Sequence, residues 1–138
     1  MKWLICLMTL IGSEAIANER LQTAVEETPY SAVVVLTGFE GPEKDSGDNY
    51  YKVQAKVLDG VRGHIINTNI TFDMYTEIGD PPKIGIGPVI ITLCNDEQGY
   101  YWPGTGSEFK ATQEQILLAK EAAKNLSDKQ RVFVHCDQ

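Results

Sequence analysis

Histidine, cysteine and serine are the residue types that could carry nucleophilic or metal chemistry, and their spacing in this chain is unfavourable. His64 and His135 lie far apart, and neither has a second ligand three or four positions away. Cys136 follows His135 directly, but neighbours on a strand point to opposite faces. No serine stands where its spacing would pair it with a histidine. The sequence therefore predicts no catalytic residue, no metal site and no cofactor.

Acidic residues are plentiful and leave one enzymatic alternative open. Hydrolysis by paired carboxylates depends on their separation in space, which sequence spacing does not give. The acidic loop at residues 40–49 lacks the alternating Asp pattern of a calcium loop, so a solvated hairpin tip is the better interpretation. A small exported hydrolase that uses carboxylates from residues 40–49 and 76–88 is the alternative function.

The first seventeen residues have the organisation of a secretory signal peptide. Lys2 precedes a short apolar run at residues 3–11, and Ala15-Ile16-Ala17 has the small-x-small pattern that signal peptidase cleaves. We expect cleavage after Ala17 and a secreted or periplasmic protein. The run is shorter than the roughly twenty residues of a membrane-spanning helix, so no membrane insertion is expected after cleavage. The alternative is an apolar N-terminal strand or helix of the folded domain.

The cysteines fit an oxidising compartment. Cys6 lies in the apolar run, which leaves Cys94 and Cys136 as an even pair. Such a pair predicts one disulfide, with two buried free thiols as the alternative. The closed loop of about forty residues corresponds to roughly 3–4 kcal/mol of stabilisation in the loop-entropy model.

Charge excludes two classes of partner. The formal net charge of −7 disfavours nucleic acids and anionic membrane surfaces, which attract clustered lysine and arginine. An acidic surface favours basic partners or serves solubility. Two N-glycosylation sequons, at Asn69 and Asn125, matter only in a eukaryotic host.

Runs of β-branched and aromatic residues predict a mostly β (α+β) protein with one domain over residues 18–138. Strands are expected at residues 31–39, 50–58, 64–74, 89–94 and 100–102, with a short final strand at 131–136. Residues 18–29 indicate a short helical turn or a flexible lead-in, and residues 76–88 a long ordered loop. Residues 113–126 form the expected C-terminal helix, with Thr112 as its N-cap and Gln115 completing a capping box. This order predicts a small five-stranded antiparallel OB-like barrel with a helix packed on it.

Two of the expected strands also carry a family resemblance. Residues 31–41 (SAVVVLTGFEG) and 50–60 (YYKVQAKVLDG) resemble the opening of the tissue-inhibitor-of-metalloproteinase and netrin-like module. The shared second-strand pattern consists of Tyr51, Val53, Val57, Leu58 and Gly60. The resemblance extends over residues 31–126 and implies an OB-like barrel. Inhibitors of that family chelate zinc through an N-terminal cysteine, but the predicted mature chain begins at Asn18, so this mechanism is not implied. The family's dense disulfide pattern is missing too.

Tyr100, Tyr101 and Trp102 are the predicted binding residues. Alternation places Tyr101 on one face of the strand and the other two on the opposite face, and outward aromatic side chains anchor interfaces. The alternative is that the barrel core takes one face and the C-terminal helix covers the other. The sequence thus predicts an exported, non-enzymatic binding or inhibitory module for a protein or small ligand. A structural subunit of an envelope or extracellular assembly is a third interpretation.

Overall fold

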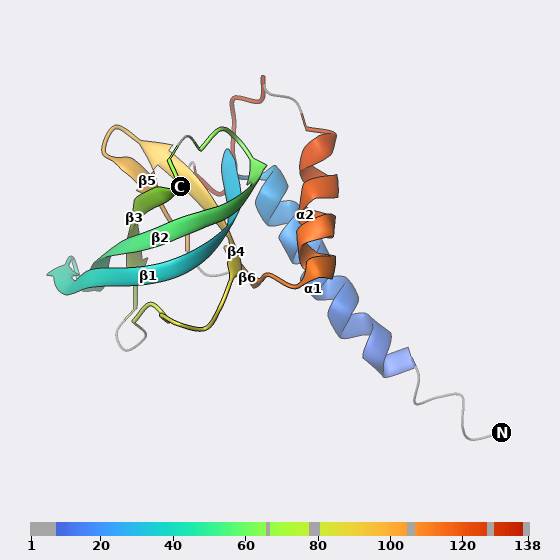
Figure 1. Cartoon of the computed structure of the whole chain (residues 1–138), viewed down its shortest axis with the longest axis horizontal. Helices are drawn as coiled ribbons and strands as arrows, with labels where there is room; N and C mark the ends of the chain where they lie inside the picture. The colour runs from blue at the N-terminus through green and yellow to red at the C-terminus, as the bar shows by residue number, and fades with distance from the viewer. Residues whose placement is uncertain (1–7, 66, 78–80, 105–106, 127–128, 137–138) are drawn as a thin grey trace.

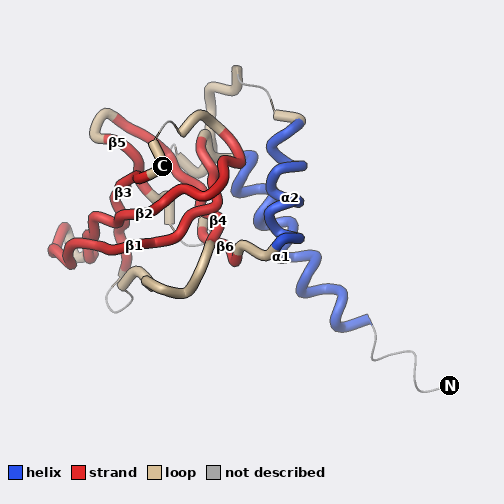
Figure 2. The backbone as a smooth tube through the Cα atoms, in the orientation of Figure 1, coloured by secondary structure: helices blue, strands red, loops and turns tan. Residues whose placement is uncertain are grey.

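The computed structural model describes residues 8–65, 67–77, 81–104, 107–126 and 129–136. Figures 1 and 2 show strands wrapped into a barrel, with two helices on one side of it. Within the described residues the elements are α1 (Met8–Glu26), β1 (Tyr30–Asp45), β2 (Asp48–Arg62), β3 (Asn69–Thr76), β4 (Val89–Asp96), β5 (Gly99–Tyr101), β6 (Glu108–Lys110) and α2 (Gln113–Lys124).

The sheet closes on itself because β1 pairs along both of its edges. It is antiparallel to β2 over most of its length and to β4 from Tyr30 to Val34. The ring order β1-β2-β3-β5-β4 makes a small closed five-stranded barrel, which is compatible with the expected OB-like fold. One pair corrects the expectation of an antiparallel barrel: β3 and β5 are parallel. A closed ring with an odd number of strands cannot alternate direction throughout, so one pair must be parallel.

Alternation along the strands divides the apolar residues between two cores. Residues of β2 and β3 that point inward fill the barrel, as the period of two predicts. Val33 and Ile90 point outward instead and pack with Leu21, Val25 and Ala119 of the two helices. The buried residues of the barrel core are Ala32, Val34, Leu36, Tyr51, Val53, Ala55, Ile70, Phe72, Met74, Val89, Ile91 and Leu93.

The predicted strand at residues 131–136 is wrong: this segment is irregular and ends in a turn. Both edges of β4 are already occupied, by β1 on one side and by β5 and β6 on the other, so the tail finds no free edge there. It is held by other contacts. The predicted disulfide between Cys94 and Cys136 is confirmed, and the amide of His135 donates to the carbonyl of Glu27 at 3.3 Å.

The C-terminal helix begins as predicted. Thr112 is the N-cap, and its hydroxyl accepts a hydrogen bond from the amide of Gln115 at 3.2 Å. The side-chain amide group of Gln115 donates to the side chain of Asn18 at 3.0 Å. That contact joins the start of α2 to the middle of α1.

Residues 18–26 belong to α1, a continuous helix that crosses the expected cleavage site, and residues 27–29 form the turn that follows it. Ala15, Ile16 and Ala17 are exposed, whereas Leu21 and Val25 are fully buried. Figure 1 shows the first half of α1 projecting away from the barrel. The packed part of the helix therefore begins after Ala17. Within the described residues, no helix is long and apolar enough to cross a membrane.

Arg62, at the end of β2, ties the C-terminus of α1 to the tail. Its guanidinium donates to the carbonyls of Val25, Glu26 and Thr28 at 2.9–3.2 Å. A cation at this end of a helix also offsets the helix dipole. The same group donates to the side chain of Gln130 at 2.8 Å and lies 5.1 Å from the ring centre of Phe133.

A chain that begins at Asn18 should be as stable as the full chain, within about 0.5 kcal/mol. The side chains that lie just before the cut are exposed. Leu21→Ala, just beyond the cut, should instead cost about 2–5 kcal/mol because it opens a cavity between the helices and the barrel. Urea unfolding measures both changes. A large loss of stability on truncation would show that residues 1–17 belong to the folded domain.

The double variant Cys94→Ala/Cys136→Ala should lose about 3–4 kcal/mol of unfolding free energy, because the disulfide closes a long loop in the unfolded chain. The sequence separation of the two cysteines is 42 residues. Urea unfolding of the wild type with and without reductant provides the control, since the reduced wild type should match the variant. A difference below about 1 kcal/mol would contradict the loop-entropy account.

Candidate functional site

The strands of the ring are not paired along their whole lengths, which leaves an opening beside the end of β3. β5 lies beside β3 only at Phe72 and Asp73. β6 pairs with the start of β4 and with no other strand of the described residues. Beyond Asp73, β3 therefore has β2 along one edge and no described strand along the other. Figure 1 shows β3 and β6 well apart at this end of the molecule.

A groove occupies this opening, with a volume of about 990 Å³. This size lies at the upper end of the roughly 300–1,000 Å³ that is typical of ligand sites. The end of β3 forms one wall, β6 forms the other, and residues 81–88 form the rim. The residues that line it are Asp48, Met74, Tyr75, Thr76, Glu77, Pro81, Pro82, Lys83, Ile86, Pro88, Val89, Trp102, Gly104, Glu108, Phe109 and Lys110.

Two side chains of the groove have buried polar atoms without a hydrogen-bond partner among the described residues. They are the indole nitrogen of Trp102, a donor, and the hydroxyl oxygen of Thr76. A buried polar group left unpaired costs about 1–3 kcal/mol. Native proteins satisfy nearly all such groups. A polar ligand or water that displaces the side chains covering these two atoms would satisfy them.

Two charged side chains of β6 lie on the barrel side of the sheet. Glu108 lies opposite Ile91 and Lys110 opposite Val89, and both of these partners belong to the barrel core. Residues directly opposite each other share a face of the sheet. Desolvation raises the pKa of the Glu108 carboxyl, and the positive charge of Lys83 partly counteracts this. The groove thus contains a carboxylate that protein atoms partly shield from water.

The three predicted binding residues do not form one outward patch. Tyr100 and Trp102 are half-buried and pack against the barrel core, and Tyr100 meets the ring of Tyr30 edge to face at 5.2 Å. Tyr101 points the other way, as alternation predicts, and its hydroxyl donates to the carbonyl of Cys136 at 2.9 Å. The tail, rather than the C-terminal helix, covers that face. Of the three, Trp102 lines the groove.

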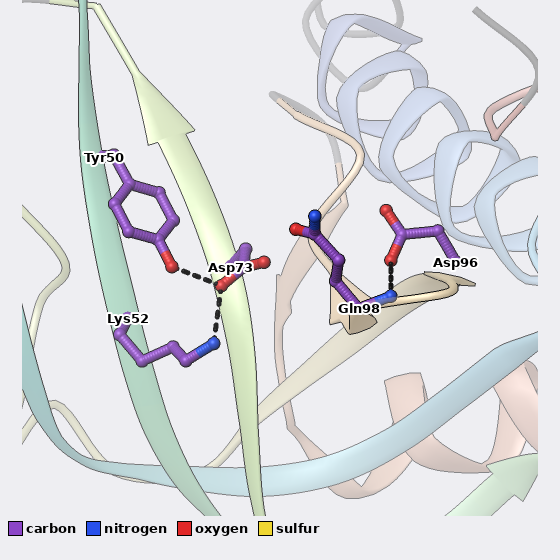
Figure 3. Close-up of polar contacts among 5 residues, drawn as sticks. All are labelled: Tyr50, Lys52, Asp73, Asp96 and Gln98. Atoms are coloured by element: carbon purple, nitrogen blue, oxygen red, sulfur yellow. Dashed lines mark hydrogen bonds and ion pairs between the residues drawn. The ribbon is translucent and has the colours of Figure 1, made fainter. Parts of the chain in front are cut away.

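A polar cluster on the outer face of β2 and β3 borders the groove. Figure 3 shows the Tyr50 hydroxyl and the Lys52 ammonium converging on one carboxylate oxygen of Asp73, at 2.6 and 3.0 Å. The Tyr75 ring, which also lines the groove, lies 5.1 Å from that of Tyr50. Sequence reasoning missed this cluster. The alternation of both strands could have revealed it, had the register that pairs Lys52 with Asp73 been known.

Several other polar residues lie outside the groove. Asn69 and Asn125 are both exposed, one at the start of β3 and the other at the C-cap of α2. Asp96 stabilises the turn between β4 and β5, where its carboxylate accepts from the amide of Gln98 at 2.8 Å (Figure 3). His64 is exposed in the connection after β2.

Three carboxylates share the groove, and two of them come from the segments 40–49 and 76–88 that the sequence analysis grouped as a possible hydrolase site. Asp48 follows the β1–β2 turn, Glu77 follows β3, and Glu108 belongs to β6. In the part of the chain that the structure describes, no three histidine, cysteine or acidic side chains cluster as a metal site would require. No protein-family model matches the sequence, and no curated protein does. The function must therefore be inferred from the chemistry of the groove.

The Asp73 cluster should make stability fall at high pH. Its hydrogen bonds raise the pKa of both Tyr50 and Lys52 above their ordinary values. The protonated forms are thus favoured in the folded state, so their contribution is present below about pH 10 and is lost as pH rises through the raised pKa values.

Tyr50→Phe/Lys52→Met should accordingly show a shallower loss of melting temperature than the wild type above about pH 10. At neutral pH, Tyr50→Phe alone should cost about 0.5–1.5 kcal/mol through the lost hydrogen bond. Lys56→Met is the matched control, since it removes an exposed lysine from the same face of β2. Parallel pH profiles for the wild type and the double variant would contradict the prediction.

Proposed function

We propose that the protein is an exported, non-enzymatic binding or inhibitory module whose ligand occupies the groove between β3 and β6. The observation that carries this proposal is the groove itself, in which the Trp102 indole nitrogen and the Thr76 hydroxyl are buried and have no partner among the residues that the structure describes. Unpaired buried groups lower stability. Their presence together in one groove is explained when a ligand satisfies them.

Two observations support export. The packed part of α1 begins after the signal-like segment, with Ala17 exposed and Leu21 buried. The disulfide between Cys94 and Cys136 suits an oxidising compartment. Secretion to the cell exterior or the periplasm is part of the proposal.

The resemblance to the netrin-like and metalloproteinase-inhibitor module also belongs to this proposal. The OB-compatible barrel supports it at the level of the fold. Asn18, at the expected mature N-terminus, lies against α2 through Gln115 and has no thiol. Any inhibition by this protein would then act through the groove rather than by zinc chelation from the N-terminus.

Thr76→Val should separate binding from stability. Removing an unpaired hydroxyl should leave stability equal or raise it by up to about 1 kcal/mol, while weakening ligand binding about five- to tenfold. The full chain with Trp3→Phe keeps Trp102 as its one tryptophan. The indole N–H signal of Trp102 can then report on a library of polar fragments and short peptides by NMR.

Thr71→Val is the matched control, because Thr71 is exposed on the outer face of β3. We expect ligands from the library to shift the Trp102 signal in the wild type and in this control, and to bind more weakly to Thr76→Val. Hits that shift only residues remote from Trp102 would overturn the assignment of the groove as the site.

A second candidate, a carboxylate-dependent hydrolase, is favoured by Asp48, Glu77 and Glu108 sharing the groove. The raised pKa of Glu108 is what a general acid requires. Turnover of a substrate that is abolished by Glu108→Gln would establish this function. Binding without turnover would establish the first.

A further inference from the structure

The C-terminal tail, described from residue 129 to residue 136, is held with little help from apolar packing. Among the described residues, the two hydrophobic cores include none from the tail. Val132 and Val134 are 65% and 59% exposed. The amides of Val134 and His135 donate to the carboxylate and the carbonyl of Glu27, both at 3.3 Å. Segments held by few apolar contacts and by exposed hydrogen bonds open locally more easily than a packed core. The disulfide is therefore the principal link between the tail and the barrel.

The two cysteines of this link differ in exposure. Cys94 is fully buried in β4, whereas Cys136 is only half-buried near the end of the tail. A thiolate reduces a disulfide by attacking one of its two sulfur atoms, and access decides which one. The Sγ of Cys136 is therefore the atom that a reductant reaches, and the Sγ of Cys94 is the leaving group.

The tail covers a polar part of the sheet. Leu93 belongs to the barrel core, so Cys94, which follows it on β4, faces outward. Tyr101 lies opposite Cys94 on β5, and its hydroxyl donates to the carbonyl of Cys136 at 2.9 Å. Cys136 thus lies over this pair. Departure of the tail would uncover a thiol and a phenol on the outer face of the sheet.

Two buried hydroxyls adjoin the covered pair. Thr92 precedes Cys94 by two residues and shares its face of β4, and Ser31 lies opposite Thr92 on β1. They are 0% and 1% exposed, and neither hydroxyl has a partner among the described residues. Farther along this face, under the helices, the corresponding pair is Val33 and Ile90. A buried hydroxyl without a partner lowers stability. Water that reaches this face when the tail leaves can bind the hydroxyls, which favours opening.

We propose that the disulfide is a reducible latch, which a dithiol reductant opens by attack on Cys136, so that the tail is released and Cys94 and Tyr101 are uncovered. The thiolate of the reductant bonds to the Sγ of Cys136, and the sulfur of Cys94 leaves with the electron pair of the S–S bond and takes up a proton. The second sulfur of the reductant then bonds to the first and frees Cys136 as a thiol. In total, two electrons and two protons pass from the reductant to the protein.

This inference goes beyond the proposed function and does not depend on the groove or its ligand. It gives the protein two states, which differ in the position of the tail and are selected by the thiol reductants that it meets. In the oxidised state the outer face of β4 and β5 is covered. In the reduced state that face is accessible, and the barrel and its helices keep their packing.

Glutathione tests the site of attack, because a monothiol has no second sulfur with which to resolve the mixed disulfide. The target is the oxidised full chain with Cys6→Ser, which leaves only the two cysteines of the latch. After an acid quench of the native reaction, we expect mass spectrometry to find glutathione on Cys136, with Cys94 as a free thiol. Glutathione on Cys94, or an adduct that forms only after denaturation, would overturn the proposal.

Dithiothreitol tests release of the tail in the same protein. On reduction, hydrogen exchange at the amides of Val134 and His135 should become at least about tenfold faster. Cys94 should then react with iodoacetamide under native conditions, and the amides of β1 and β2 should stay protected. A tail that keeps its protection, with Cys94 unreactive, would overturn the proposal. Loss of protection throughout the barrel would overturn it too, because the disulfide would then hold the whole fold rather than the tail.

Tyr101→Phe tests whether the tail lies over Tyr101. This variant removes the hydrogen bond to the carbonyl of Cys136 and leaves the disulfide in place. After reduction, we expect Cys94 to be alkylated about two- to tenfold faster than in the wild type. Tyr50→Phe is the matched control, since it removes a tyrosine hydroxyl that binds Asp73 instead of the tail. Equal rates in Tyr101→Phe, Tyr50→Phe and the wild type would contradict the assignment of Tyr101 to the covered face.

Discussion

The double pairing of β1 is the constraint on which the rest of the structure depends. Because β1 pairs with β2 along one edge and with β4 along the other, the sheet must curl into a ring. Both faces of β1 are then buried over residues 31–36. Val34 points into the barrel, and Val33 points outward, where α1 and α2 cover it. The helices are therefore the second layer that the outward face of β1 and β4 requires, since that face would otherwise expose Val33 and Ile90 to water.

Closure of the ring also decides how the C-terminal tail is held. With both edges of β4 in use, the tail does not pair with β4 and is held by individual side-chain and backbone contacts. The disulfide fixes Cys136 to β4, and the Tyr101 hydroxyl binds the carbonyl of the same residue. Arg62 adds a link between the end of α1 and Gln130. Gly63, which follows Arg62, allows the end of β2 to lie close to the segment after α1. Its φ is +77°, and a Cβ there would lie 2.6 Å from the carbonyl oxygen of Pro29.

The groove lies beyond the short stretch over which β3 and β5 pair. β5 is short and pairs with β3 only at Phe72 and Asp73. β6 pairs with the start of β4, and among the described strands it does not pair with β3. The seam combines an accessible part of the core with two buried polar atoms, on Thr76 and Trp102, that have no partner among the described residues. Stability alone would favour closing this seam or replacing Thr76 with an apolar residue. Buried polar groups that lower stability in this way are expected at functional or strained sites.

The sequence by itself determined the positions of most strands, the C-terminal helix with its Thr112 cap, the disulfide pair and the inward-facing residues of β2 and β3. These depend on local alternation, capping chemistry and cysteine count. Only the tertiary structure decided the parallel β3–β5 pair, the irregular tail, the length of α1 and the site. The site brings together Asp48, Thr76, Trp102 and Glu108, which come from four separate stretches of the chain. Their proximity depends on which strand edges meet and on the register between them, and these are set by closure of the whole sheet rather than by any local pattern of residues.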